Sequence, residues 1–205
     1  DLSVSRGLGD VYKRQLLNSL GFPNEGVRSI QSRLKKVSDD ICLGVNIGPN
    51  KDTVSEKVIN DYLLCYEEVF EYADFVTINI SSPNTPNLRS LHNAEKFKAV
   101  IDAVLSERNR HQKKPKVFIK ISPDEESKTY TKLIEIINNS AIDGVIISNT
   151  SNNQNLKKSL NVAHLTGGIS GKSLKNSSNK ILEEIKTLIN KEKIIVAVGG
   201  IFDVD

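Results

Sequence analysis

Small polar side chains collect in the stretch from Asn79 to Arg89, directly after the apolar run Phe75 to Ile80. The run is rich in β-branched residues and predicts a buried strand. Pro83 and Pro86 restrict the backbone after it and hold the loop in an extended path. Amide and hydroxyl side chains delivered from the end of a strand are typical of a ligand site in a parallel α/β protein.

Other polar residues stand in or at the ends of apolar runs. Asn46 and Asn79 fall inside two of them, and a buried amide left unpaired costs about 1–3 kcal/mol. A backbone group can satisfy either amide, but two amides at equivalent strand ends favour ligand contact. Lys120 ends a third run, and its charge either reaches solvent or faces negative charge on a ligand. Ser81 and Ser82 open the first loop, where a serine more often makes a turn hydrogen bond.

Two glycine-rich stretches, Thr166 to Gly171 and Gly199 to Gly200, can present backbone N–H groups to a phosphate. Glycines in turns with positive φ are the usual alternative. The phosphate interpretation gains weight only because both stretches fall on the same predicted edge of the sheet.

These residues need a scaffold, and from residue 24 onward apolar runs alternate with amphipathic segments, as in βα units around a parallel sheet. The five expected strands are Ile41 to Ile47, Phe75 to Ile80, Val117 to Ile121, Gly144 to Ser148 and Ile194 to Val198. Helices are expected near 26–37, 54–72, 93–109, 126–139 and 176–191. Five such units would be part of a (β/α)8 TIM barrel, which typically needs about 250 residues. A doubly wound sheet also fits the pattern.

The composition narrows the function classes. The chain has 205 residues, 38% of them hydrophobic and 26% charged, which fits one soluble domain. Its 28 basic residues are interspersed with 25 acidic ones, so no nucleic-acid groove is indicated. No apolar run approaches the roughly 18 residues that span a bilayer. Nucleotide hydrolysis and α/β-hydrolase chemistry lack their motifs.

Cysteine and histidine positions indicate no metal site, because none matches a metal-ligand spacing. Cys42 lies in a predicted strand and Cys65 in a predicted helix, so both are expected to be reduced core thiols. The second helix carries Val58, Tyr62, Cys65, Val69 and Tyr72 at helical spacing, which predicts a core stripe.

The ends of the chain suggest an incomplete polypeptide. There is no Met, and the sequence stops directly after a strand-like run. Residues 1–15 show neither helical nor strand periodicity and are read as a loop or as a foreign or disordered segment, which leaves 16–205 as the partial barrel domain.

Seven ordered motifs over residues 16–205 resemble the dihydroorotate dehydrogenases, specifically the class 2, quinone-reducing branch. They are Asn18 to Gly26, Leu43 to Gly48, Asn79 to Arg89, Ile119 to Asp124, Asp143 to Thr150, Thr166 to Gly171 and Val198 to Ile201. The resemblance implies an FMN enzyme of pyrimidine biosynthesis that oxidises (S)-dihydroorotate to orotate and passes the electrons to a membrane quinone, ubiquinone or menaquinone. It also implies that the five strands are the third to seventh of the barrel.

The resemblance assigns roles to individual residues. Ser82 would be the catalytic base, where class 1 relatives have Cys. The substrate-binding positions would be Asn18, Ser19, Leu20, Gly21, Phe22, Asn79, Asn84, Asn149 and Thr150. The FMN-binding positions would be Asn46, Asn79, Lys120, Ser148, Gly171 and Gly200. Two of these depart from the family pattern, because the family usually has Arg at Ser19 and Thr at Ser148.

Several family segments have no counterpart in the chain, namely the first two strands, the last strand and the N-terminal helices that contact the membrane. The chain by itself is therefore expected to bind FMN poorly and to be inactive. The complete protein would be peripheral to the cytoplasmic membrane in a bacterium, or to the inner mitochondrial membrane in a eukaryote. Three alternatives remain. The first is a non-catalytic barrel-derived binding domain. The others are a dihydropyrimidine dehydrogenase, which is expected to have Cys at the position of Ser82, and a dihydrouridine synthase, which is expected to have a basic RNA-binding surface.

Overall fold

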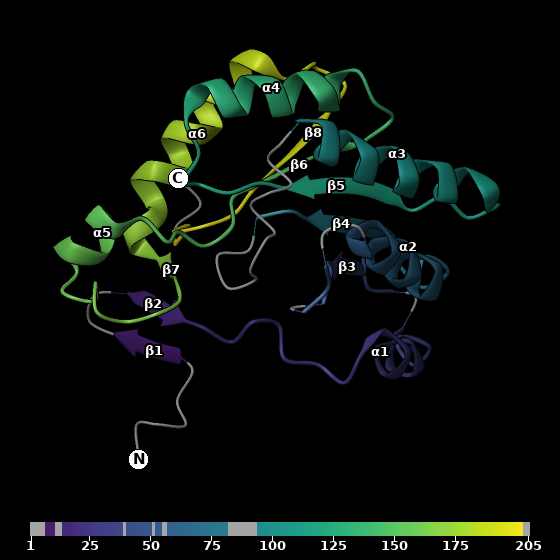
Figure 1. Ribbon diagram of the computed structural model, residues 1–205, viewed down its shortest axis with the longest axis horizontal. Coiled ribbons are helices and arrows are strands. Elements are labelled where there is room, and N and C mark those ends of the chain that lie inside the picture. The colour runs from purple at the N-terminus through teal and green to yellow at the C-terminus, as the bar shows by residue number, and fades with distance from the viewer. Residues whose placement is uncertain are drawn as a thin grey trace.

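The computed structural model describes residues 7–10, 14–38, 40–50, 52–54, 57–81 and 94–202. Its centre is a five-stranded parallel sheet in the order β3-β4-β5-β6-β8 (Figure 1). The strands are β3 (Gly44–Ile47), β4 (Phe75–Asn79), β5 (Lys116–Lys120), β6 (Gly144–Ile147) and β8 (Ile194–Ala197). All five predicted strands are therefore present, in chain order across the sheet.

Five helices alternate with these strands, as the sequence pattern predicts. They are α1 (Val27–Leu34), α2 (Val58–Val69), α3 (Ala94–Arg110), α4 (Ser127–Asn138) and α6 (Lys175–Leu188). Consecutive helices pack against one another along one face of the sheet (Figure 1). A parallel crossover needs a helix between each pair of strands, and the run of neighbouring helices is the expected consequence.

The core lies between the sheet and this helical layer. The predicted stripe of α2 buries Val58, Tyr62 and Val69 and leaves Cys65 and Tyr72 half-buried. In β4 every residue after Phe75 is buried, so this strand is covered on both faces. On the face away from the helices, the ring of Phe118 packs edge-on against Phe75, with centroids 5.5 Å apart.

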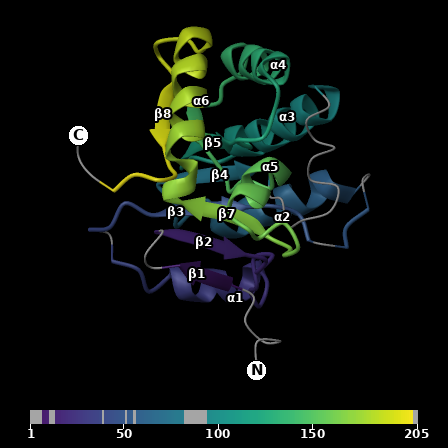
Figure 2. The same ribbon diagram turned by 90° about the vertical axis from the view of Figure 1, so that its left-hand side faces the viewer.

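A second, antiparallel sheet was not anticipated from the sequence. It consists of β1 (Gly7–Asp10), β2 (Gln15–Asn18) and β7 (Gly168–Gly171) in the order β1-β2-β7 (Figure 2). The interpretation of residues 7–10 as a loop was therefore wrong, and the glycine-rich stretch that ends at Gly171 forms a strand. Four-residue strands without alternating patterning carry too little local signal, and long-range pairing decides them.

The small sheet is joined to the carboxyl end of the parallel sheet. Ser151, just after β6, forms a bridge with Ile169 of β7. A short helix, α5 (Gln154–Ser159), lies beside this junction (Figure 1). The small sheet is thus placed next to the strand ends at which the sequence predicts the site.

The outer strands of the parallel sheet differ from the central ones. In β8, Ile194 and Val196 are 37% and 36% exposed, and Val198 just after it is 41% exposed. At the other edge, β3 begins at Gly44, later than the predicted Ile41, which is exposed. Just before the strand, the N–H of Leu43 donates to the carboxylate of Asp74, and the N–H of Asp74 donates to the carbonyl of Leu43. Cys42 is exposed, so its assignment to the core was wrong, and both cysteines are free.

Gly144→Ala is expected to destabilise the fold by about 1–3 kcal/mol, the usual range for overpacking. A Cβ at this position would lie 2.0 Å from the backbone oxygen of Ile194, its partner in β8. Urea denaturation of the variant measures the change. Gly48→Ala is the matched control, because a Cβ there meets only Asn79 O at 3.8 Å; equal stability of the two variants would contradict the packing argument.

Candidate active site

Polar side chains from three neighbouring strands meet at the carboxyl edge of the sheet. Asn79 ends β4 and is paired in register with Lys120, which ends β5. Ser148 and Asn149 follow β6 directly. Asn79, Ser148 and Asn149 are 2%, 3% and 7% exposed, and Ser81 is fully buried. The prediction that the strand ends bring these residues together is confirmed for this group.

Three of these side chains are joined by hydrogen bonds. Asn149 Nδ2 donates to Asn79 Oδ1 at 3.0 Å and to Ser81 Oγ at 3.2 Å. The backbone N–H of Ser81 donates to Asn79 Oδ1 at 3.2 Å, and Ser81 Oγ donates to the carbonyl of Lys120 at 2.9 Å. Burial makes such a satisfied network rigid, because breaking one bond leaves a polar atom without a partner.

Tyr62 of α2 anchors the network on the side of the helices. Its hydroxyl donates to the backbone oxygen of Asn79 at 2.7 Å. Burial raises the pKa of Tyr62 far above its usual value, and the nearby Cys65 and Asp61 act in the same direction. The phenol therefore stays protonated and keeps donating to the end of β4.

The amino group of Lys120 is desolvated at the edge of this cluster. Burial is the cause that lowers the pKa of Lys120 below its ordinary value of 10.5. Among the described residues no acidic group raises this pKa, and a desolvated ammonium favours the approach of an anion, which would raise it again. Position alone left the role of Lys120 open, and its partial burial favours a charge that faces the site.

Lys120→Met is expected to raise the free energy of unfolding of the ligand-free protein at pH 7, since the folded state then no longer holds a desolvated charge. Because the folded pKa is lowered, the unfolded chain binds the proton more readily, so wild-type stability rises as pH increases toward 10.5. The gain from the variant should therefore shrink between pH 7 and pH 10. Urea denaturation at both pH values measures it, with the exposed Lys132→Met as control; a gain that grows with pH would refute the sign.

The loop after β6 is tied to the loop after β5. Asp124 accepts hydrogen bonds from Ser151 Oγ at 2.5 Å and from the backbone N–H of Asn152 at 2.6 Å. The backbone N–H of Asn149 donates to Ile121 O at 2.9 Å. These bonds hold Asn149 and Thr150 against the end of β5.

Gly171 and Gly200 come together at the start of a helical segment. The short 3-10 turn Lys172–Leu174 leads directly into α6. Gly200 has φ +70°, and an added Cβ would lie 2.7 Å from Lys175 N and 3.0 Å from Gly171 O. Gly171 has φ +90°, and its added Cβ would lie 2.4 Å from Arg14 O. Neither glycine has room for a side chain, and both lie at the N-terminal end of a helical segment. Such an arrangement of exposed backbone is suitable for binding a phosphate group.

A cavity of 450 Å³ lies beside the network, between β3, α2, α1 and the loop that precedes α1. Gly21, Phe22, Asn46 and Asn79 are among the residues that line it. Asn46 is exposed, so the argument from a buried, unpaired amide was wrong for this residue. The cavity nevertheless places Asn46 near Asn79, as its proposed ligand role requires.

The remaining predicted residues are spread around this site. Asn18 ends β2, opposite Gly168, and is half-buried like Ser19 and Thr150. Leu20 and Phe22 are 46% and 50% exposed, so the structure buries neither against a partner. Ser82 and Asn84 lie outside the described residues, and their roles stay predictions.

Sequence reasoning missed three residues that shape the site. Ser81 was interpreted as a turn serine and Tyr62 as a core residue, whereas both bond to groups at the strand ends. Asp124 was quoted only within a motif, and no local signal shows that it reaches the loop after β6. In the described part of the chain, no group of three or more His, Cys, Asp or Glu is arranged to hold a metal ion.

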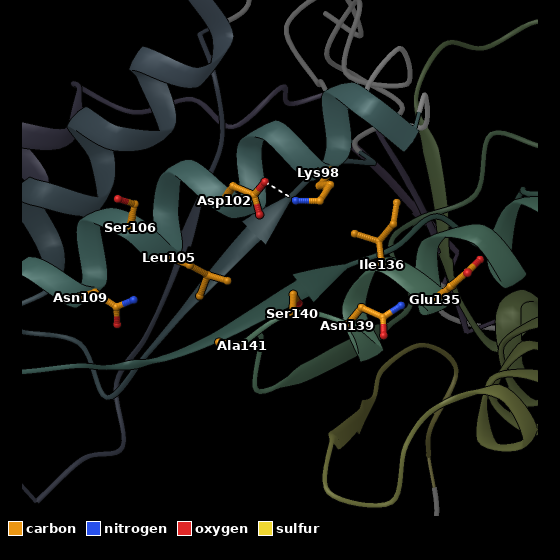
Figure 3. A pocket seen from close by; sticks show the side chains of 10 residues that line it. All are labelled: Lys98, Asp102, Leu105, Ser106, Asn109, Glu135, Ile136, Asn139, Ser140 and Ala141. Carbon is orange, nitrogen blue, oxygen red and sulfur yellow. Dashed lines mark hydrogen bonds and ion pairs between the residues drawn. The ribbon is translucent and has the colours of Figure 1, made fainter.

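A larger cavity, of 730 Å³, lies on the outer side of the fold between α3 and α4 (Figure 3). Lys98 and Asp102 form an ion pair at one end of it (Figure 3). Ser106, Asn109 and Asn139 also line it, and none of its lining residues belongs to the network at the strand ends. The smaller cavity is therefore the one associated with the predicted chemistry.

Comparison with known proteins identifies the family. The family model described as dihydroorotate dehydrogenase matches residues 9–205. Proteins named dihydroorotate dehydrogenase (quinone) from Pectobacterium carotovorum and Aliivibrio fischeri are 39% and 38% identical over 190 and 194 residues. One of the same name from Escherichia coli is 37% identical over 190 residues. Each alignment covers 91% of this chain and 56% of the relative, so the chain spans about half the length of these relatives.

Solved structures agree with this result. The ligand-free dihydroorotate dehydrogenase of Eimeria tenella superposes with a TM-score of 0.88 and 30% identity, covering 97% of this chain and 61% of that one. Its complex with ferulenol gives a TM-score of 0.87 at 29% identity, covering 97% and 59%. The five βα units are thus part of a TIM barrel, as predicted, and the chain belongs to the dihydroorotate dehydrogenase family.

Proposed function

We propose that the protein, at the length its gene encodes, oxidises (S)-dihydroorotate to orotate, with FMN as hydride acceptor and a quinone as final electron acceptor. The observation that carries the proposal is the contact between the Asn79 and Asn149 amides, 70 residues apart in sequence, beside the desolvated Lys120. Neutral amides suit a ring of amide groups, because they both donate and accept hydrogen bonds. The name shared by the bacterial relatives supports the quinone-reducing branch.

The residues present fit FMN. Gly171 and Gly200 would hold its phosphate, since a side chain at either position would meet backbone atoms. Asn46, Asn79, Lys120 and Ser148 would contact its ring system, and the ammonium of Lys120 can compensate negative charge there. When bound, FMN supplies the acceptor for the hydride that leaves C6 of the substrate.

Ser82 would remove the proton from C5 of dihydroorotate. Loss of that proton and of the C6 hydride leaves the C5=C6 double bond of orotate. A hydroxyl is a weak base, so the site has to orient the substrate and exclude water for this step to proceed. The burial of Asn79, Ser81 and Asn149 supports such exclusion on one side of the ring.

Quinone reduction implies work at a membrane surface, since quinones with long tails are dissolved in the lipid. Within the described residues, no helix is both long and apolar enough to cross a bilayer. We therefore propose peripheral contact through a segment preceding the barrel, as the family resemblance implies.

The test is anaerobic addition of dihydroorotate to the protein expressed at the length its gene encodes. Loss of the absorbance of oxidised flavin near 450 nm, about where flavins generally absorb, is the expected result. Regeneration of the absorbance by a soluble ubiquinone or menaquinone analogue would support the second half-reaction. Flavin that is bound but not bleached would overturn the proposed substrate, and protein without flavin would favour a non-catalytic binding domain.

A further inference from the structure

Ser81 lies at the centre of the site network and takes no direct part in the proposed proton and hydride transfers. It is fully buried and stands two residues after Asn79, directly before the proposed base Ser82. Ser81 connects the ends of three strands. Its hydroxyl bonds to Lys120 O and Asn149 Nδ2, and its backbone N–H bonds to Asn79 Oδ1. A serine that only closed its own turn would not reach two other strands.

Backbone groups determine which way the two amides point. The backbone N–H of Ser81 can only donate, so the atom of Asn79 that faces it at 3.2 Å is the oxygen. The atom of Asn149 that lies 3.0 Å from this oxygen must then be the nitrogen. Independently, the N–H of Thr150 donates to the other end of the Asn149 amide, Oδ1, at 2.9 Å. Both anchors require the same orientation.

The hydroxyl of Ser81 completes the arrangement. The carbonyl of Lys120 can only accept, so the hydroxyl proton of Ser81 is directed to it, at 2.9 Å. The lone pairs of Ser81 Oγ are then left for Asn149 Nδ2, at 3.2 Å. A flipped Asn149 amide would place its oxygen against two acceptors, Asn79 Oδ1 and Ser81 Oγ.

The hydrogen-bonding groups that these two amides have left for a ligand are of one kind each, a donor or an acceptor. Both N–H groups of Asn149 are used, which leaves one lone pair of its oxygen. Both lone pairs of Asn79 Oδ1 are used, and no other described residue accepts from its Nδ2. We propose that Ser81 is a positioning residue that makes Asn79 a pure donor and Asn149 a pure acceptor toward the bound ring. The site would thereby select a cyclic amide edge, with a carbonyl oxygen toward Asn79 and an N–H toward Asn149.

This inference rests on the proposed function and deepens it, because dihydroorotate and orotate carry such amide edges. Without the Ser81 hydroxyl, one N–H of Asn149 loses its acceptor, and the amide is held only by Asn79 Oδ1 and the N–H of Thr150. A site that rejects ligands through fixed donors and acceptors would then lose part of its selectivity.

A double-mutant cycle on the full-length protein tests the coupling. Orotate affinity is measured by calorimetry for wild type, Ser81→Ala, Asn149→Ala and the double variant, with flavin content and thermal unfolding as checks on folding. Ser81→Ala should weaken orotate about 10-fold, the equivalent of one misplaced hydrogen bond at about 1.4 kcal/mol. It should have no further effect once Asn149 is alanine, whereas additive losses would overturn the inference.

Ring-methylated orotates supply a readout that a purely structural role would not change. Wild type should discriminate strongly against the isomer whose methyl replaces the N–H facing Asn149, and Ser81→Ala should reduce that discrimination several-fold. Unchanged discrimination would also overturn the inference. Wild-type protein that binds no orotate would overturn the proposed function and this inference together, whereas normal wild-type binding with additive variants overturns only the inference.

Discussion

Ser82→Ala is expected to slow anaerobic flavin reduction by dihydroorotate by about 10²–10⁴-fold, the range that a positioned general base contributes. The variant keeps the amides of Asn79 and Asn149, so orotate affinity and flavin content should change little. A loss confined to the rate of reduction is the signature of a proton acceptor rather than of a binding residue. Stopped-flow absorbance at saturating dihydroorotate measures that rate directly.

Two companion variants make the experiment specific. Ser106→Ala removes a hydroxyl from the outer cavity between α3 and α4, away from the network, and should leave the rate unchanged. Ser82→Cys introduces the residue that class 1 relatives carry and should retain part of the rate, because a thiol is also able to accept the proton. A reduction rate for Ser82→Ala within about threefold of wild type would exclude Ser82 as the base.

Gly200→Ala is expected to lower FMN affinity by about 100-fold or more, equivalent to roughly 2.7 kcal/mol. The added Cβ would lie 2.7 Å from Lys175 N and 3.0 Å from Gly171 O, both backbone atoms that have no flexible side chain to move aside. Relieving the contact has to separate the end of the β8 loop from the start of α6. That separation opens the cradle in which the phosphate is proposed to lie.

The control for this variant is Gly26→Ala, which isolates backbone strain from collision. Gly26 has φ +91°, but no atom lies within 4 Å of its added Cβ. Its alanine variant should lose about 1–3 kcal/mol of stability, because φ +91° with ψ +159° is a backbone conformation almost confined to glycine, and it should keep its flavin. Equilibrium dialysis of FMN compares the two proteins. Tight FMN binding by Gly200→Ala would remove Gly200 from the phosphate site.

Repeated local signals explain why the main scaffold was predictable. β4 and β6 are nearly continuous runs of β-branched residues, and long amphipathic segments separate them from their neighbours, so both period and length identify them. The small sheet was not predictable in this way. β2 and β7 have four residues each, and their paired residues are 150 to 156 positions apart, so their pairing depends on where the rest of the chain brings them.

Within the site, residue type was more informative than burial. The apolar run around Asn46 suggested a buried amide, but β3 stands at the edge of the sheet and leaves that side chain exposed. The role of Lys120 was left open because a lysine at the end of a strand can extend its charge either to solvent or toward a ligand. Its pKa is lowered by burial, which only the folded chain produces.

The amino-acid sequence alone was enough to predict the parallel βα architecture, the edge at which the polar residues gather and the family whose motifs they match. Those properties follow from side-chain periodicity and from short motifs, which are local. The folded structure was needed to see that Ser81, Asn79 and Asn149 form one network with fixed donors and acceptors, and that Gly171 meets Gly200. The contacts of Asn149 with Asn79 and Ser81 and that of Gly171 with Gly200 join residues 29 to 70 positions apart. The direction of a hydrogen bond depends on the backbone groups that folding places beside each side chain.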